Sequence, residues 1–212
     1  MNHKGVSGQL LIGLVVAAML SFVLVKFFII PNFGSQEEEK QYFYDTVNAL
    51  KIPENRLSKL NEYNELIENA IDENDADISL ELVKALILTS NANVDEKLKN
   101  EQRAGLLPLD IETATRYGLI VNNENDERLI AEKSINAGVQ YLKYLKEKVH
   151  DNKNKLDDIS YMVLGFYKGY DVVLNSCPVG ISGGFENCDP NSLANVPLQE
   201  VIGYEKYLNS LA

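Results

Sequence analysis

The stretch "LVKALILTSNANV", residues Leu82 to Val94, is an apolar run that stops abruptly at Thr89, Ser90 and Asn91. On a helix, its apolar residues surround the axis almost completely, and Ser79 in front of it is a suitable N-cap. The pattern predicts a central buried helix. Its end carries neutral hydroxyl and amide groups, although the chain holds 31 Asp and Glu residues.

The sequence on both sides of this run repeats its apolar residues at helical spacing, and no segment alternates as a strand would. Asp110 can cap a short helix that Gly118 ends, and Asp126 can begin a long helix that runs to Val149. The chain from about residue 56 onward is therefore predicted to be all-α, with further helices around residues 60–71, 159–167 and 198–208.

Composition excludes several classes of function. A formal charge of -11 repels phosphate backbones, so nucleic acid is not an expected partner. The two histidines, His3 and His150, are too few for a histidine-dependent triad or metal site, and no metal or cofactor is expected. Cys177 and Cys188 flank a glycine-rich loop, where they form either a disulfide in an oxidising compartment or two free thiols.

The N-terminal segment predicts a membrane anchor. Residues 10–30 are almost continuously apolar and long enough to cross about 30 Å of hydrocarbon. The run is too long for a cleaved signal peptide, and Lys4 before it favours a cytoplasmic N-terminus at residues 1–9. A linker and juxtamembrane helix would occupy residues 31–55, and the exterior domain residues 56–212. A pilin-like leader is the weaker alternative, because the usual Glu is absent.

Four sequence blocks follow one another in the exterior domain: "LVKALI" (82–87), "GLLPLDIETA" (105–114), "SINAGVQYL" (134–142) and "FYKGY" (166–170). In order and spacing they resemble the blocks L-V-x-A-x-I-x-x-E-S, G-L-M-Q-x-x-x-x-T-A, N-I-x-x-G-x-x-Y-L and A-Y-N-x-G of the SLT-type lytic transglycosylase domain. The resemblance spans roughly Tyr63 to Leu208. It implies a lysozyme-like helical domain, in a family whose members cleave peptidoglycan glycan strands.

The catalytic acid of that family has no counterpart here. The Glu of E-S protonates the glycosidic oxygen, helped by a partly apolar cleft. An ungapped alignment places Ser90 and Asn91 at E-S, and a one-residue gap places Thr89 and Ser90 there. Pro108 stands in place of the Gln of G-L-M-Q, and Lys168 in place of the Asn of A-Y-N. A hydroxyl cannot act as a general acid near neutral pH.

Three functions remain open. The first is a membrane-anchored, extracytoplasmic pseudoenzyme of the cell envelope that binds a glycan or a protein partner through the old cleft. The second is an active transglycosylase whose acid has moved to Glu101 or Glu112. The third is a structural component of an envelope or pilus-like assembly. For the first, the expected cleft residues are Ser90, Asn91, Leu107, Tyr167 and Lys168.

Overall fold

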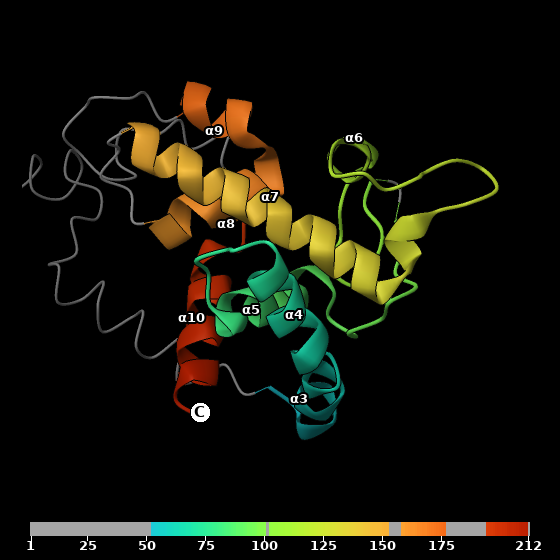
Figure 1. Cartoon of the computed structure of the whole chain (residues 1–212). Coiled ribbons are helices and arrows are strands. Elements are labelled where there is room, and N and C mark those ends of the chain that lie inside the picture. The colour runs from blue at the N-terminus through green and yellow to red at the C-terminus, as the bar shows by residue number, and fades with distance from the viewer. Residues whose placement is uncertain (1–51, 101, 153–157, 177–193, 212) are drawn as a thin grey trace, which may run out of the picture. The chain divides into compact units, whose positions relative to one another are not determined.

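The computed structural model describes residues 52–100, 102–152, 158–176 and 194–211 (Figure 1). The chain divides into two units, Met1–Tyr44 and Asp45–Ala212, and the described residues all belong to the second. Their regular elements are helices. The β structure among the described residues consists of isolated bridges, so the all-α prediction is confirmed for this part. The elements are α3 (Glu54–Asn61), α4 (Asn64–Glu73), α5 (Leu80–Ser90), α6 (Ile111–Arg116), η2 (Glu127–Leu129), α7 (Ala131–Asn152), α8 (Asp158–Lys168), α9 (Tyr170–Ser176) and α10 (Leu198–Asn209).

Several predictions fall outside the described residues. The predicted membrane span at residues 10–30 is one of them, and within the described ranges no helix is both long and apolar enough to cross a bilayer. Glu101 and the two cysteines, Cys177 and Cys188, also lie outside these ranges.

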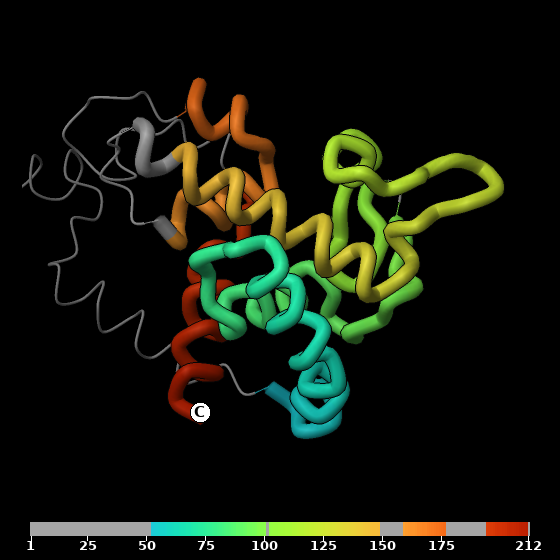
Figure 2. The backbone as a smooth tube through the Cα atoms, viewed as in Figure 1, coloured from blue at the N-terminus to red at the C-terminus, as the bar shows by residue number. Residues whose placement is uncertain are grey.

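Helix α5 is the central helix, as its apolar run predicts. The Ser79 hydroxyl accepts a hydrogen bond from the Leu82 backbone N–H at 3.2 Å, which caps the first turn. All seven residues from Leu82 to Leu88 are buried. One of them is Lys84, whose ammonium group donates to the Asn61 side chain at 2.7 Å. Helices α4 and α10 pack against α5, and Figure 2 shows the α10 segment beside it.

Helix α7 begins later than the sequence predicted. Asp126 does not cap it, because both carboxylate oxygens of Asp126 bind Arg128, each at 2.8 Å. A 3-10 turn follows, Ile130 is extended, and α7 starts at Ala131. Apolar residues that recur along this helix are part of the core: Ile135, Val139, Leu142 and Leu145 are each fully buried.

The segment between α5 and α6, called the 91–110 loop and described except for residue 101, packs against the core. Gly105 has φ +101°, which L side chains rarely adopt, and an added Cβ would lie 2.2 Å from the Arg128 carbonyl oxygen. Gly138 of α7 makes room for Leu107, whose Cδ2 would lie 2.3 Å from a Cβ at that position. Gly138 thus allows this loop to pack against α7.

Candidate functional site

The site begins at the end of α5, where Thr89 and Ser90 carry the two hydroxyl groups that the alignment of the first sequence block places opposite E-S. The Thr89 hydroxyl lies 2.9 Å from the Tyr167 hydroxyl of α8, and it also donates to the Ala85 carbonyl at 3.0 Å. The Ser90 hydroxyl donates to the Leu86 carbonyl. Both residues are partly exposed. The last turn of α5 thus presents hydroxyls that bind the helix backbone and one tyrosine.

Asn91, predicted to line the cleft, is 1% exposed and supports the loop instead. Its amide nitrogen donates to the Asp95 carbonyl at 2.8 Å and to the Leu106 carbonyl at 3.2 Å. Its side-chain oxygen accepts from the Asp95 N–H at 2.9 Å. Because both the nitrogen and the oxygen of its side-chain amide are hydrogen-bonded to the protein, Asn91 is a structural residue of the 91–110 loop.

Leu107, another residue predicted to line the cleft, is also buried. It is fully buried against Gly138, so its side chain cannot touch a ligand in this arrangement. Pro108, which replaces the family's Gln, is buried as well. The Ser134 hydroxyl of α7 accepts hydrogen bonds from the Leu106 N–H at 3.1 Å and the Leu107 N–H at 3.4 Å. The second block therefore packs against α7 rather than forming a ligand surface.

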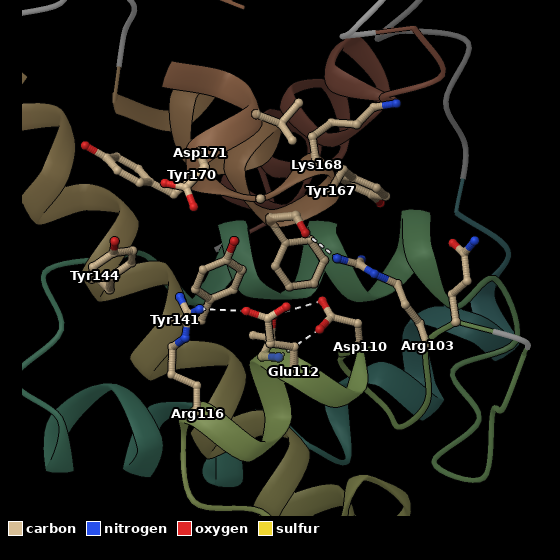
Figure 3. A pocket seen from close by; sticks show the side chains of 15 residues that line it. Arg103, Asp110, Glu112, Arg116, Tyr141, Tyr144, Tyr167, Lys168, Tyr170 and Asp171 are labelled. Atoms are coloured by element: carbon tan, nitrogen blue, oxygen red, sulfur yellow. Dashed lines mark hydrogen bonds and ion pairs between the residues drawn. The ribbon is translucent and has the colours of Figure 1, made fainter. Parts of the chain in front are cut away.

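A cavity of about 330 Å³ has Tyr167, the residue that contacts Thr89 at the end of α5, in its lining (Figure 3). Residues from the 91–110 loop, α6, α7, α8 and α9 line it, and most of them are polar or aromatic. Of the predicted site residues, Tyr167, Lys168 and Glu112 are among them, whereas Ser90, Asn91 and Leu107 are not. Its charged lining residues are Arg103, Asp110, Glu112, Arg116, Lys168 and Asp171, and its aromatic ones are Tyr141, Tyr144, Phe166, Tyr167 and Tyr170.

Arg103 is a cavity residue that the sequence did not indicate. Its guanidinium lies over the rings of Phe166 and Tyr167, with the central carbon 4.7 Å and 5.6 Å from the two ring centres. Nη2 donates to the Phe166 carbonyl, and Nη1 is buried without a hydrogen-bond partner among the described residues. Burial lowers the pKa of this guanidinium, yet arginine remains charged at any physiological pH.

Two carboxylates of the cavity are already engaged by the protein. Asp110 caps α6, because its Oδ1 accepts from the Thr113 N–H at 2.7 Å and its Oδ2 from the Thr113 hydroxyl at 2.8 Å. This N-cap was predicted and is confirmed. Glu112, one of the two replacement acids considered, pairs with Arg116 at 2.8 Å and its side chain is 83% exposed. It does not sit in the partly apolar setting that a general acid of this family uses.

Two tyrosines of the cavity, Tyr141 and Tyr167, are held neutral by their surroundings. Burial is the main factor that raises the pKa of Tyr167 and of Tyr141 above the usual value. The Tyr141 hydroxyl donates to the Gly165 carbonyl at 2.7 Å, which ties α7 to α8. Tyr144 contacts both neighbouring rings, Tyr141 with centres 6.4 Å apart and Tyr170 with centres 5.7 Å apart. Aromatic faces of this kind suit the apolar face of a sugar ring.

The sequence indicated part of this site only. Tyr167 and Lys168 were found because they stand in a block at the cleft wall. Arg103 and Tyr144 were missed because they lie outside the four blocks, and Tyr170 was given no role although it lies in one. Each is close in sequence to a block residue, Gly105, Tyr141 or Gly169, and that closeness was the signal that could have indicated them. Across the described residues, no group of three or more His, Cys, Asp or Glu side chains is arranged to hold a metal ion.

Comparison with known proteins supports the resemblance that the four blocks carry. The family model of the Transglycosylase SLT domain matches residues 69–167, a little under half of the chain. The match runs from within α4 to Tyr167 of α8, and so includes α5, the 91–110 loop and α7. A search of curated proteins gave no match. Together with the all-helical fold, the family match supports placing residues 69–167 with the SLT transglycosylase domains of the lysozyme-like superfamily.

Proposed function

We propose that this protein is a membrane-anchored, extracytoplasmic relative of the lytic transglycosylases that binds cell-wall glycan without cleaving it. The observation that carries the proposal is the end of α5. There Thr89 and Ser90 bind Tyr167 and backbone carbonyls, at the position where the family has its acid. General acid catalysis contributes roughly 10² to 10⁴ in rate, so a site without the acid is expected to bind but not to turn over.

Binding does not need the missing acid. A tyrosine ring can stack on the apolar face of a sugar, while hydroxyl and charged groups bind its hydroxyls and carbonyls. The cavity offers both kinds of group, since Tyr144, Tyr167 and Tyr170 line it together with Arg103 and Lys168. A cavity of about 330 Å³ is within the range of small-ligand sites, which suits one or two sugar units of a longer strand.

The test is a pair of assays on purified peptidoglycan with the full-length protein in detergent. We expect sedimentation with the wall material and no clearing of a peptidoglycan zymogram. Tyr167→Phe and Lys168→Gln should each weaken sedimentation. Glu124→Gln is the matched control, because Glu124 lies in an exposed turn and does not line the cavity. A protein that does not sediment with the glycan at all would overturn the proposal.

Two further variants examine the loss of catalysis itself. Ser90→Glu and Thr89→Glu each place a carboxyl at one of the two aligned positions, beside the Tyr167 hydroxyl. If the scaffold has kept the family's geometry, one of them gains measurable clearing. Clearing by the wild type, abolished in Glu112→Gln or Glu101→Gln, would instead establish the alternative of an active enzyme with a relocated acid.

The membrane anchor and the disulfide remain predictions of the sequence. We expect the full-length protein in the membrane fraction, resistant to alkaline carbonate and released when residues 1–35 are removed. Non-reducing peptide mapping should find Cys177 joined to Cys188 if the domain faces an oxidising compartment. A soluble full-length protein with two free thiols would contradict this location. The third option, a structural role in an assembly, predicts instead that cavity substitutions change nothing.

A further inference from the structure

We propose that Arg103 reads a carboxylate on the bound glycan, so that the site selects anionic over neutral sugar chains. The inference rests on the proposed glycan-binding function and names the feature of the ligand that the cavity recognises. It depends on the position of one guanidinium, on its unused donor and on the way the neighbouring acids are bound.

The guanidinium of Arg103 is held in place but not saturated. Its central carbon lies over the rings of Phe166 and Tyr167, and Nη2 is bound to the Phe166 carbonyl, which holds the group in place (Figure 3). Nη1 is buried and has no partner among the described residues. A buried donor without an acceptor is unfavourable, so an incoming oxygen that meets it is favoured by the same amount. Arginine binds carboxylates with two parallel hydrogen bonds, a geometry that lysine cannot reproduce.

The acids of the cavity do not already fill this role. Asp110 is the acid with the strongest electrostatic effect on Arg103, but its two oxygens accept hydrogen bonds from Thr113. Glu112 is paired with Arg116. Asp171 lies beside Tyr170 at the start of α9, and Figure 3 shows it well separated from Arg103. A ligand carboxylate would therefore meet Arg103 without displacing an existing ion pair.

A second positive group lines the cavity. The neighbouring hydroxyl pair adds no donor, because Thr89 donates to the Ala85 carbonyl and the Tyr167 hydroxyl, 2.9 Å away, donates to Thr89. Lys168 lines the same cavity. In a chain of net charge -11, Arg103 and Lys168 bring two positive charges to this cavity. Such a setting favours an anionic group over a hydroxyl.

The experiment compares two probes that differ in one group. The first is a tetrasaccharide of alternating N-acetylglucosamine and N-acetylmuramic acid with free lactyl carboxylates, and the second is the same chain with those carboxylates converted to carboxamides. Affinities are measured by titration calorimetry with the full-length protein in detergent. We expect the acid to bind about tenfold more tightly than the amide, as for one charge-assisted hydrogen bond, and the ratio to fall as salt is added.

The variants assign the preference to a residue. Arg103→Gln should bring the ratio of the two affinities to about one, and Arg103→Lys should retain part of it. Arg116→Gln is the control, because Arg116 lines the same cavity but already binds Glu112. It should keep the wild-type ratio. A purely structural Arg103 would weaken both probes equally and leave the ratio unchanged, and that result would overturn the inference.

The remaining outcomes are also decisive. If the wild type binds both probes equally, the inference is wrong while the proposed function stands. If it binds neither probe, glycan binding itself is wrong, and the carboxylate preference fails with it. Thermal melting of each variant shows whether it is folded. Should Arg103→Gln not fold, the wild-type ratio and Arg103→Lys still decide the question.

Discussion

The two sides of the 91–110 loop use their polar groups differently. On the side that faces the core, Asn91, Ser134 and Arg128 bind backbone groups of the loop through hydrogen bonds that are mostly buried. On the side that faces the cavity, Arg103 keeps one donor unused, and Thr89 shares a hydroxyl–hydroxyl contact with Tyr167. Buried polar groups that are fully bonded specify one backbone arrangement. Substitutions on the core side are thus expected to change stability, and those on the cavity side to change binding.

The largest loss of stability is expected from a substitution of Gly105, on the core side of the loop. Gly105→Ala places a Cβ 2.2 Å from the Arg128 carbonyl oxygen at φ +101°, so the loop must move away from α7. We expect a loss of about 4 kcal/mol in the free energy of unfolding, measured by urea denaturation. Gly118→Ala is the control, because its φ of +85° is similar but no atom lies within 4 Å. It should cost only about 1 kcal/mol. Equal losses would show that the contact with Arg128 is unimportant.

The next largest loss of stability is expected when the ion pair between Asp126 and Arg128, beside the loop, is broken. Arg128 is 3% exposed, binds both oxygens of Asp126 and donates to the Leu109 carbonyl at 3.1 Å. Asp126→Asn leaves the buried guanidinium without its countercharge, and we expect about 3 kcal/mol of destabilisation. The exposed pair of Lys97 and Glu96 provides the control, since Glu96→Gln should change stability by less than about 0.5 kcal/mol.

The same pair predicts a pH dependence. The hydrogen bonds from Arg128, followed by those from Lys99, lower the pKa of Asp126 to about 2. Because the folded pKa lies below the unfolded value near 4, this contribution is complete above about pH 4 and is lost as pH falls toward 2. Urea midpoints measured from pH 5 to pH 2 should fall less steeply in Asp126→Asn than in the wild type. Parallel curves would contradict this assignment.

A smaller effect separates two adjacent residues. Asn91→Ala removes a buried amide that binds Asp95 and Leu106, and should cost about 2 kcal/mol. Ser90→Ala removes a partly exposed hydroxyl that donates to the Leu86 carbonyl of its own helix, and should stay within about 0.5 kcal/mol. Both are measured by thermal melting. If Ser90→Ala proved the more damaging of the two, the division between a core side and a cavity side would be wrong.

The smallest effect is expected at Glu112. Its bond to Arg116 joins two exposed side chains four residues apart on α6, so Glu112→Gln should change the free energy of unfolding by less than about 0.5 kcal/mol. On the proposed function it also leaves the absence of wall-clearing activity unchanged. Chemical denaturation and the zymogram together check both statements.

Local rules were enough for much of the fold. Ser79 and Asp110 were recognised as caps because an N-cap needs only its own oxygen and an N–H three residues on. The buried run from Leu82 to Leu88 was recognised from its composition alone. The start of α7 was misplaced because Asp126 has the residue type of a cap, yet the pull of Arg128 and Lys99 decides its orientation. Interactions between distant segments override local preference there.

The candidate site was predicted less completely, for a related reason. The block from Gly105 to Ala114 shows which residues are apolar but not which side of the loop faces α7. Leu107 was assigned to the cleft, and its contact with Gly138 shows that it points the other way. Arg103 could not be assigned, because its place over Phe166 and Tyr167 depends on a helix more than 60 residues later. Tyr167 was predicted because it belongs to the fourth sequence block, "FYKGY".

The packing of α10 against α5 has a consequence for how much of the chain is needed to keep the domain folded. Helix α10 lies outside the region that matches the family model, yet its Val201, Tyr204 and Leu208 are buried. A fragment ending at Tyr167 would leave part of the apolar helix α5 exposed to water, which would promote aggregation and proteolysis. A chain truncated before residue 198 is therefore expected to lose the fold in which the cavity exists.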